Sequence, residues 1–261
     1  MLQNSSPFDH VAKTRSHNNR ASQFSHTEKN NSSRQQKRTS ANGRHLFYLE
    51  DVGQEFDHIQ ALKNVELAID KGEIVFITGA SGAGKTTLLR ILSGEMEPQS
   101  GKVIRPEESG PKAQFLSKVF QDLRLMPKWS IDENLDMAFD SSAYRNRKEF
   151  EADKQDIAKV LGFQDRLHLK IYQANGGLKQ KVAITRALLT KPDIFMADEP
   201  TSSLDSDNAQ RIFDVLNLYN NKKGMTVIWA SHNKELVKRF TGRIVHLDKG
   251  HLVYSGHACF I

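Results

Sequence analysis

The sequence predicts an α/β fold in which helices cover both faces of a parallel sheet. One sign is three nearly continuous apolar segments, Glu73–Thr78, Ile194–Ala197 and Thr226–Ala230. A strand that is apolar on both faces belongs in the middle of a covered parallel sheet. The other sign is a set of helical patterns between them, Thr86–Leu92, Lys179–Leu189 and Asn208–Tyr219. Strands that alternate with helices are typical of this fold class.

The two ends of the folded region add further strands. We expect order to begin with a strand over Leu46–Asp51. Residues 65–70 alternate between core-forming and mostly polar side chains, which predicts a strand with one solvent-facing side. Near the other end, Arg243–Leu247 and His251–Ser255 flank Asp248-Lys249-Gly250, which is the pattern of a β-hairpin.

A helical insertion is expected where the alternation breaks, between about Leu123 and Gln173. Ser130 and Glu133 have the spacing of a capping box, in which each side chain bonds the other residue's backbone N–H at a helix start. A second helix is predicted around Lys148–Leu161. The residues available for its apolar face are Phe150, Ile157, Val160 and Leu161.

Composition excludes several classes of protein. The chain of 261 residues is 38% hydrophobic and 26% charged, which suffices for a sizeable core. Its single cysteine, Cys259, cannot form an internal disulfide, so we expect a reducing compartment. No stretch approaches the ~20 apolar residues that span a bilayer, and the first residues lack the apolar core of a secretion signal. We therefore expect a soluble chain whose membrane role passes through a partner.

The net charge of +6 lies entirely in residues 1–45. Of the 37 basic and 31 acidic residues, eight and two lie in this tail, which leaves 29 of each in the rest of the chain. The tail is rich in Ser, Asn, Gln, His and Arg, so we expect it to be disordered. Three interpretations are open: a solvated extension, a weak electrostatic tether to anionic lipid or nucleic acid, and a transit peptide.

The segment that follows the first apolar strand predicts a site for nucleotide phosphates. Gly79-Ala80-Ser81-Gly82-Ala83-Gly84-Lys85-Thr86-Thr87 fits the pattern G-x-x-x-x-G-K-[ST] between a strand and a helix. Its glycines let backbone N–H groups surround phosphate oxygens, and the helix dipole adds favourable potential. The Lys85 ammonium can reach the β- and γ-phosphates, and the Thr86 hydroxyl can coordinate Mg²⁺.

Two carboxylates follow the apolar strand Ile194–Ala197. Asp198 and Glu199 stand at a strand's carboxyl end, where ligands of open α/β sheets bind. Asp198 can hold Mg²⁺ through water, and Glu199 can accept a proton from attacking water. Together with the phosphate loop, the pair predicts hydrolysis of a nucleoside triphosphate.

Over roughly residues 46–256, the motifs in this order resemble those of ABC-type ATPases. Phe120-Gln121-Asp122 resembles the family's Q-loop, Ser203-Leu204-Asp205 its D-loop, and Ser231-His232 its switch histidine. Phe56 stands where the family stacks an aromatic ring on adenine. The resemblance implies an α/β, P-loop ABC ATPase core with a parallel sheet, a small antiparallel β region on the N-terminal side and a helical insertion subdomain.

The same resemblance sets the expected domain boundaries. They are a disordered basic tail over 1–45, an ATP-binding domain over 46–256 with the helical subdomain and signature at about 123–177, and a C-terminal end over 257–261.

The family's signature motif, Leu-Ser-Gly-Gly-Gln, is altered in this chain. The matching residues are Ala174-Asn175-Gly176-Gly177-Leu178. Asn175 caps a helix about as well as serine does, and both glycines remain, so a phosphate can still approach the helix start. Leu178 removes an amide that could form a hydrogen bond. We expect this departure to affect the hydrolysis rate more than nucleotide binding.

The resemblance also implies roles for particular residues. Glu199 and His232 would be catalytic, and Asp205 would couple the subunits of a dimer. The implied Mg²⁺ ligands are Thr86, Gln121 and Asp198. The implied ATP contacts are Phe56, Gly79, Ala80, Ser81, Gly82, Ala83, Gly84, Lys85, Thr86, Thr87, Gln121, Asn175, Gly176 and Gly177.

A reaction cycle with partners follows from the same resemblance. A head-to-tail homodimer would close on two ATP molecules and open after hydrolysis. The motion would pass through Gln121 to an integral membrane subunit of the FtsX or permease type, at the cytoplasmic face of the inner membrane. No specific nucleic-acid site is expected. An apolar segment forms either an exposed groove for the membrane subunit or part of the insertion's interior: Leu123, Leu125, Met126, Pro127 and Trp129.

Within the family, the segments Val119–Asp122, Gly79–Thr87 and Ala197–Thr201 look most like the ATP-binding half of the bacterial cell-division pair FtsE–FtsX, which regulates septal cell-wall hydrolysis. Two alternatives are open. The ATPases of lipoprotein-release and macrolide-efflux systems share much of the pattern. The altered signature also allows a nucleotide-gated scaffold with little hydrolysis.

Removal of residues 1–45 is expected to leave ATP binding and thermal stability unchanged, because every nucleotide motif lies after Leu46. If the tail is a tether, its removal also abolishes salt-sensitive binding to anionic vesicles, since each basic residue near such a surface contributes up to ~1 kcal/mol that salt screens. Vesicle co-sedimentation of both forms at low and physiological salt measures this. Lower nucleotide affinity after truncation would contradict the boundary, and vesicle binding by neither form would exclude the tether.

Overall fold

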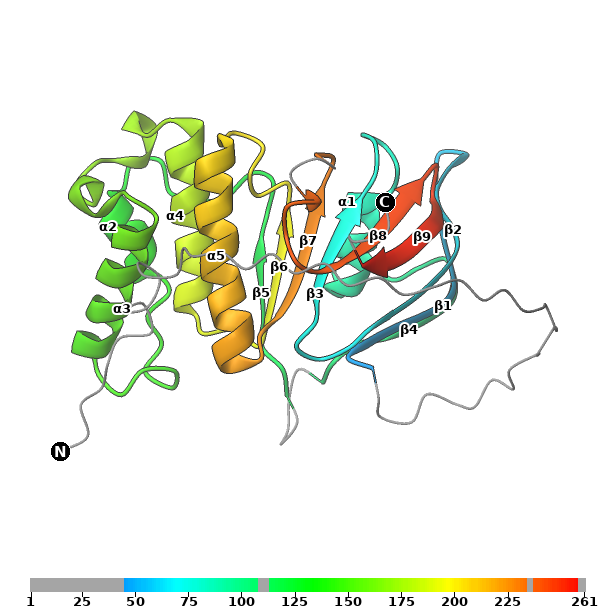
Figure 1. The fold of residues 1–261 in the computed structure, drawn as a ribbon, viewed down its shortest axis with the longest axis horizontal. Helices are drawn as coiled ribbons and strands as arrows, with labels where there is room; N and C mark the ends of the chain where they lie inside the picture. The colour runs from blue at the N-terminus through cyan, green and yellow to red at the C-terminus, as the bar shows by residue number, and fades with distance from the viewer. Residues whose placement is uncertain (1–44, 108–112, 234–236, 258–261) are drawn as a thin grey trace, which may run out of the picture. The chain divides into compact units, whose positions relative to one another are not determined.

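The computed structural model describes residues 45–107, 113–233 and 237–257 (Figure 1). The predicted tail lies outside this described part, except for its last residue, His45. The expected C-terminal end also lies outside it, except for its first residue, His257, and so does Cys259. The strands are β1 (Phe47–Phe56), β2 (Ile59–Ile69), β3 (Ile74–Thr78), β4 (Ser100–Ile104), β5 (Leu116–Val119), β6 (Ile194–Asp198), β7 (Thr226–Ser231), β8 (Arg243–Asp248) and β9 (His251–His257). The helices are α1 (Lys85–Leu92), α2 (Ile131–Asp136), α3 (Arg147–Val160), α4 (Gly176–Leu189) and α5 (Ser206–Lys223), with 3₁₀ turns η1 (Gln164–Arg166) and η2 (Ile171–Gln173).

The larger sheet confirms the predicted parallel core. Its strand order is β5-β6-β7-β3-β8-β9, and all pairs are parallel except the predicted terminal hairpin, where β9 runs antiparallel to β8. Every residue of β3, β6 and β7 is buried. These are the three segments that the sequence marked as apolar on both faces.

Side chains of β3 point alternately into two cores. Val75 and Ile77 belong to the buried cluster that includes the apolar face of α1. The Phe76 ring points to the other face, with its centroid 5.8 Å from the Trp229 ring and 6.0 Å from the Phe213 ring. Phe213 lies on α5, so α1 covers one face of the sheet and α5 the other (Figure 1). Helices on both faces were predicted.

The smaller sheet, of order β2-β1-β4, is antiparallel. Val65, Leu67 and Ile69 of β2 are buried while Glu66 is exposed, as their alternation predicts. The sequence reading did not predict β4 or β5. β4 is largely exposed and lacks an apolar period, and β5 has four residues, too few for a period to be visible.

The helical insertion begins with the predicted capping box. The Glu133 backbone N–H donates to Ser130 Oγ at 3.1 Å, and the Ser130 N–H donates to a Glu133 carboxylate oxygen at 2.6 Å. In α3, Phe150 and Ile157 are fully buried, as is Leu161 just past its end. No helix among the described residues is long and apolar enough to cross a membrane.

A buried cation joins α2 to α3. Lys154 is 1% exposed, and its Nζ lies 2.6 Å from a carboxylate oxygen of Asp132 and 2.7 Å from those of Asp136 and Glu151. Burial alone would lower the pKa of Lys154, but the hydrogen bonds to the three carboxylates outweigh it and raise this pKa. The acidic cluster therefore holds an ammonium group and is part of the insertion's core.

Replacement of Lys154 by Met is expected to lower the free energy of unfolding by about 2–3 kcal/mol. It removes the buried cation from three carboxylates, of which Asp136 and Glu151 keep only their pairs with the more exposed Arg147. Removing one partner of a buried pair is strongly destabilising. Chemical denaturation measures the loss, with Lys159→Met on the exposed side of the same helix as the matched control. Equal stability of the two variants would show that the cluster does not hold the insertion together.

Candidate functional site

The phosphate loop connects β3 to α1, and the Lys85 side chain folds back over it. Lys85 is 7% exposed. Its Nζ donates hydrogen bonds to the carbonyl oxygens of Gly79 at 2.9 Å and Ala80 at 3.1 Å. A buried ammonium group requires such partners. The Lys85 charge is therefore held inside the loop whose backbone N–H groups surround a phosphate in this motif.

Two glycines give the loop its shape. Gly82 and Gly84 have φ values of 78° and 103°, in the left-handed region that glycine adopts without strain. A Cβ on Gly84 would lie 2.4 Å from the carbonyl oxygen of Ala61 and 2.9 Å from Leu62 Cδ2, so β2 packs directly on the loop. A Cβ on Gly82 would meet nothing within 4 Å. The loop is thus closed on one side and open on the other, which fits the approach of a phosphate.

A threonine and an aspartate form a pair of oxygen donors beside the loop. Thr86 Oγ1 donates to Asp198 Oδ2 at 2.6 Å. Burial raises the pKa of Asp198, the Thr86 hydrogen bond opposes this, and the neighbouring Glu199 carboxylate raises it further. A divalent cation would offset the unfavourable proximity of the two negatively charged carboxylates, Asp198 and Glu199. Hydroxyl and carboxylate oxygens are ligands that Mg²⁺ prefers, so the residues present fit the ion.

Glu199 is held in a left-handed conformation with its carboxylate between two basic groups. Its φ is 50°, which a non-glycine residue adopts only when its surroundings fix it. The His232 backbone N–H donates to Oε1 at 2.8 Å, and His232 Nδ1 lies 2.9 Å from Oε2. Lys85 Nζ is 3.6 Å from Oε1. The structure therefore brings Glu199, His232 and Lys85 together at the carboxyl end of β6.

Two residues expected at the ATP site make no hydrogen bond or ion pair with this cluster in the described part of the chain. Gln121 follows β5, and its exposed side chain makes no hydrogen bond within the described ranges. Phe56 is 42% exposed at the end of β1, where it pairs with Ile59 across the turn to β2. Both side chains are accessible to a ligand, and their roles stay predictions.

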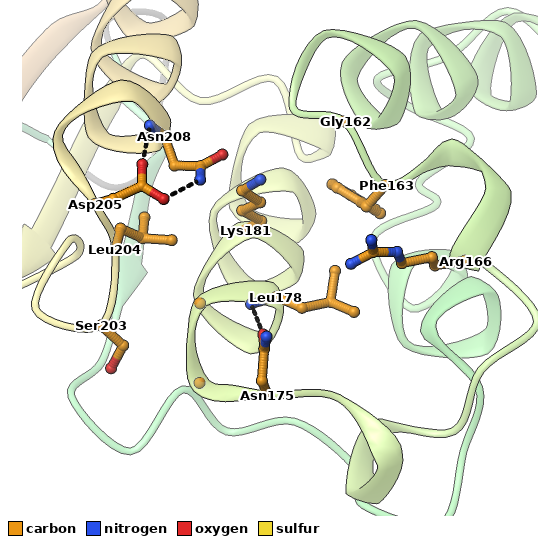
Figure 2. Close-up of a pocket in the computed structure, with 12 residues that line it drawn as sticks. Gly162, Phe163, Arg166, Asn175, Leu178, Lys181, Ser203, Leu204, Asp205 and Asn208 are labelled. Atoms are coloured by element: carbon orange, nitrogen blue, oxygen red, sulfur yellow. Dashed lines mark hydrogen bonds between the residues drawn. The ribbon is translucent and has the colours of Figure 1, made fainter.

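The altered signature lines a separate pocket of about 450 Å³ at the start of α4 (Figure 2). Asn175 is the N-cap as predicted, since its Oδ1 accepts the Leu178 backbone N–H at 2.9 Å. Arg166 and Lys181 also line the pocket, and sequence reasoning missed both. Lys181 lies three residues after Leu178 on the same helix, so helical spacing places both side chains on one face and could have predicted Lys181 beside the signature. Arg166 precedes α4 without any motif.

Asp205 lies on another wall of this pocket, at the start of α5 (Figure 2). It is the N-cap of that helix, since its Oδ1 accepts the Asn208 backbone N–H at 2.8 Å. That hydrogen bond is the main reason why the pKa of Asp205 is lowered. The residue therefore presents a carboxylate beside the signature, and its coupling role stays a prediction.

The D-loop packs directly on the signature glycines. A Cβ on Gly177 would lie 2.9 Å from Leu204 Cδ2 and 3.0 Å from the Ser203 carbonyl oxygen. Gln180 Nε2 donates to Ser202 Oγ at 2.8 Å, and its Oε1 accepts the Ser203 N–H at 3.1 Å. The sequence reading missed Gln180, which ties α4 to the segment that follows Glu199. Gly177 is needed for this contact within the chain, whatever ligand the pocket takes.

The phosphate loop and the signature lie on different sides of the sheet's middle strands. Figure 1 shows α1 and α4 well separated, with β6 and β7 between them. The pocket at the start of α4 has no lining residue from the phosphate loop. The phosphate loop and the signature pocket, here called the two half-sites, therefore do not meet within one chain.

The apolar segment after Gln121 is largely exposed. Met126 and Trp129 are each 43% exposed, and Pro127 is exposed. Leu123 and Leu125 are partly buried. Of the two interpretations left open above, the exposed surface is the one that the burial favours.

A phosphate loop beside two carboxylates and a histidine is the arrangement found in P-loop nucleotide hydrolases. In that class, catalysis comes from the positioning of groups and charges around a phosphoryl group. Within that class, the sequence model described as "ABC transporter" matches residues 62–202, more than half of the chain. The chain belongs to the ABC transporter family. It is an ABC-type ATPase, and its nucleotide and ion are ATP and Mg²⁺.

Curated relatives agree with this assignment. The chain is 31% identical over 220 residues to the methionine import ATP-binding protein MetN of Clostridioides difficile and 34% identical over 215 residues to the phosphonates import ATP-binding protein PhnC of Bdellovibrio bacteriovorus. These matches cover 81% and 76% of this chain, and 68% and 82% of the relatives. The spermidine/putrescine import ATP-binding protein PotA of Fusobacterium nucleatum is 31% identical, and the match spans 79% of this chain and 56% of PotA.

A solved structure with the same fold is the ATP-binding cassette MJ0796, described as a dimer in a post-hydrolysis state bound to ADP and Pi. Its TM-score is 0.69 at 29% identity, over 82% of this chain and 100% of that chain. The curated relatives MetN, PhnC and PotA are import ATP-binding proteins, so they support the family and not the narrower likeness to FtsE. They also support a nucleotide-binding subunit that works with a membrane permease, without identifying the system.

Proposed function

We propose that two copies of this chain close head-to-tail on two ATP molecules and use their hydrolysis to drive an integral membrane subunit. The observation that carries the proposal is the separation of the two half-sites within one chain (Figure 1). A two-fold arrangement completes both sites at once, because each contact is made twice. The dimeric state of the similar cassette MJ0796 supports this arrangement.

The phosphate loop would hold the β- and γ-phosphates of ATP. On binding, the Lys85 ammonium exchanges the carbonyl oxygens of Gly79 and Ala80 for phosphate oxygens. Thr86 and Asp198 would hold Mg²⁺, with Gln121 as a further ligand, and the ion supplies charge that stabilises the phosphate oxygens. Phe56 would stack on the adenine ring.

Glu199 would act as the general base. A water oxygen attacks the γ-phosphorus, the bond to the leaving ADP oxygen breaks, and the water proton passes to the Glu199 carboxylate. The His232 contacts hold that carboxylate in place, 2.8 Å from its backbone N–H. Lys85 and His232 would also stabilise the charge of the transferring phosphoryl group.

The second copy would supply the start of its α4 to the same γ-phosphate. Asn175, Gly176 and Gly177 present the helix N-terminus, which favours anions. Arg166 and Lys181 add positive charge to this pocket (Figure 2). Asp205 lines the other side of this pocket, where it would couple the two subunits of the dimer. Loss of the γ-phosphate removes the group that bridges the copies, so the dimer opens.

The membrane subunit would dock on the exposed apolar surface formed by Leu123, Leu125, Met126, Pro127 and Trp129. It follows Gln121 directly in the chain, so a change at the nucleotide is transmitted over a few residues. Two classes of membrane subunit are candidates. The motif resemblance favours a partner of the FtsX type in septal cell-wall regulation, and the import names of the relatives favour a solute permease. A lipoprotein-release or efflux subunit fits the same surface.

Reconstitution with the membrane protein encoded beside this chain distinguishes the systems. A partner with few transmembrane helices and a large external domain that stimulates phosphate release supports the cell-division type. A many-helix permease that does so supports solute transport. Phosphate release at background level with and without a bound partner would instead support a nucleotide-gated scaffold.

Replacement of Glu199 by Gln is expected to preserve ATP affinity and to slow phosphate release by at least ~10²-fold, because Gln keeps the shape and loses the base. Steady-state phosphate release and equilibrium ATP binding measure the two quantities. Glu107→Gln, which changes an exposed carboxylate just after β4, is the matched control. Turnover that is unchanged by the Glu199 substitution would remove its assignment as base.

Restoration of the signature with Asn175→Ser and Leu178→Gln together is expected to tighten the ATP-dependent dimer. The gain is about 1–2 kcal/mol, as one or two hydrogen bonds to a charged group contribute. Analytical ultracentrifugation with Mg-ATP on a Glu199→Gln background measures it. A dimer no tighter than the parent would show that the native motif is already adequate.

A further inference from the structure

A partly buried arginine outside the predicted motifs holds the turn that follows Gln121. Arg186 lies on α4 and donates from Nη1 to the carbonyl oxygen of Arg124 at 2.8 Å and from Nη2 to that of Leu123 at 2.9 Å. Burial lowers the pKa of Arg186. No carboxylate pairs with this guanidinium in the described part of the chain. The two carbonyl oxygens are therefore what compensates its removal from water.

The backbone that Arg186 contacts is strained. Leu123 and Arg124 have φ values of 58° and 45°. Consecutive non-glycine residues in the left-handed region are disfavoured and persist when their surroundings fix them. Within the turn, the Leu123 N–H donates to the Phe120 carbonyl oxygen at 2.9 Å, and the Arg124 guanidinium stacks 3.2 Å from the Phe120 ring centroid. These contacts are local, whereas Arg186 anchors the turn to another element.

The anchor connects the turn to the helix that begins at the signature. Arg186 lies ten residues after Gly176, so about 15 Å of α4 separates the guanidinium from the helix start. The planar guanidinium donates in parallel to two adjacent carbonyl groups, a geometry that the lysine ammonium does not reproduce. A displacement of the signature helix therefore moves both carbonyls of the turn with it.

We propose that Arg186 is a positioning residue that fixes the backbone after Gln121 and couples it to the helix carrying Asn175, Gly176 and Gly177. This rests on the proposed function, in which Gln121 senses the nucleotide. Arg186 touches neither nucleotide nor reacting atoms. Its role is to make the backbone after Gln121 move together with the helix that carries the signature.

The first test replaces Arg186 by Lys in the full chain. Without nucleotide, amide exchange at residues 122–125 is expected to accelerate about tenfold, while the buried strand β6 exchanges as before. With Mg-ATP, kcat is expected to fall about tenfold while KM for ATP changes less than about twofold, because the phosphate loop is untouched. Arg90→Lys, on the exposed side of α1, is the matched control and should change none of these values.

The second test is a rescue that a merely structural arginine would not show. In the Arg186→Lys background, Arg124→Gly and Arg124→Ala both remove the side chain from the Phe120 ring. Only the glycine substitution also removes the penalty of the left-handed backbone. Arg124→Gly is therefore expected to recover at least half of the lost exchange protection and of the lost kcat, whereas Arg124→Ala is expected to recover neither.

Three results would overturn the proposal. They are unchanged exchange at residues 122–125 after Arg186→Lys, a fall in kcat without that exchange, and equal effects of glycine and alanine at position 124. If Arg186→Lys does not fold, recovery of folding by Arg124→Gly alone supports the proposal, and failure of both double variants overturns it. If the native chain shows no ATP hydrolysis, the proposed function fails, while the exchange measurements still decide the role of Arg186.

Discussion

The burial of β3 between two cores determines where the chemistry of this protein lies. β3 pairs in parallel with β7, and β7 with β6, so the carboxyl ends of these strands reach the same edge of the sheet. Thr78 lies beside Ser231 in that register. The residues that follow the strands, Gly79, Glu199 and His232, are consequently delivered to one place. The apolar residues of the strands thus fix polar groups that are more than a hundred positions apart in the chain.

The Lys85 ammonium of the site is held by groups that a ligand can replace. Lys85 Nζ bonds two carbonyl oxygens of its own loop and lies 3.6 Å from the Glu199 carboxylate. Carbonyl groups satisfy a buried cation without neutralising it. The positive charge at the phosphate loop therefore remains available to a phosphate, whereas Lys154, surrounded by three carboxylates, is committed to the fold.

The sequence predicted those parts of the structure that depend on local pattern. The apolar strands, the Ser130 capping box and the Asn175 helix cap each depend on residues within a few positions of one another, so their spacing reveals them. The left-handed backbone at Glu199 and the contact between Arg186 and the turn after Gln121 depend on packing between distant segments. No residue type at those positions signals them. β4 remained hidden for the converse reason, since its exposed side chains follow no apolar period.

The ammonium group shared by α2 and α3 has a consequence for how the insertion can move. The Lys154 ammonium pairs with Asp132 and Asp136 of α2, and Arg147 of α3 also pairs with Asp136, so the two helices resist moving apart and behave as a stiff block. Stiff blocks change orientation only at their connections to the rest of a protein. One such connection is the turn at Leu123 and Arg124, whose backbone is already in an uncommon conformation. Because Arg186 fastens this turn to α4, a change in the orientation of the insertion would be carried to the backbone near Gln121 and not absorbed within the turn.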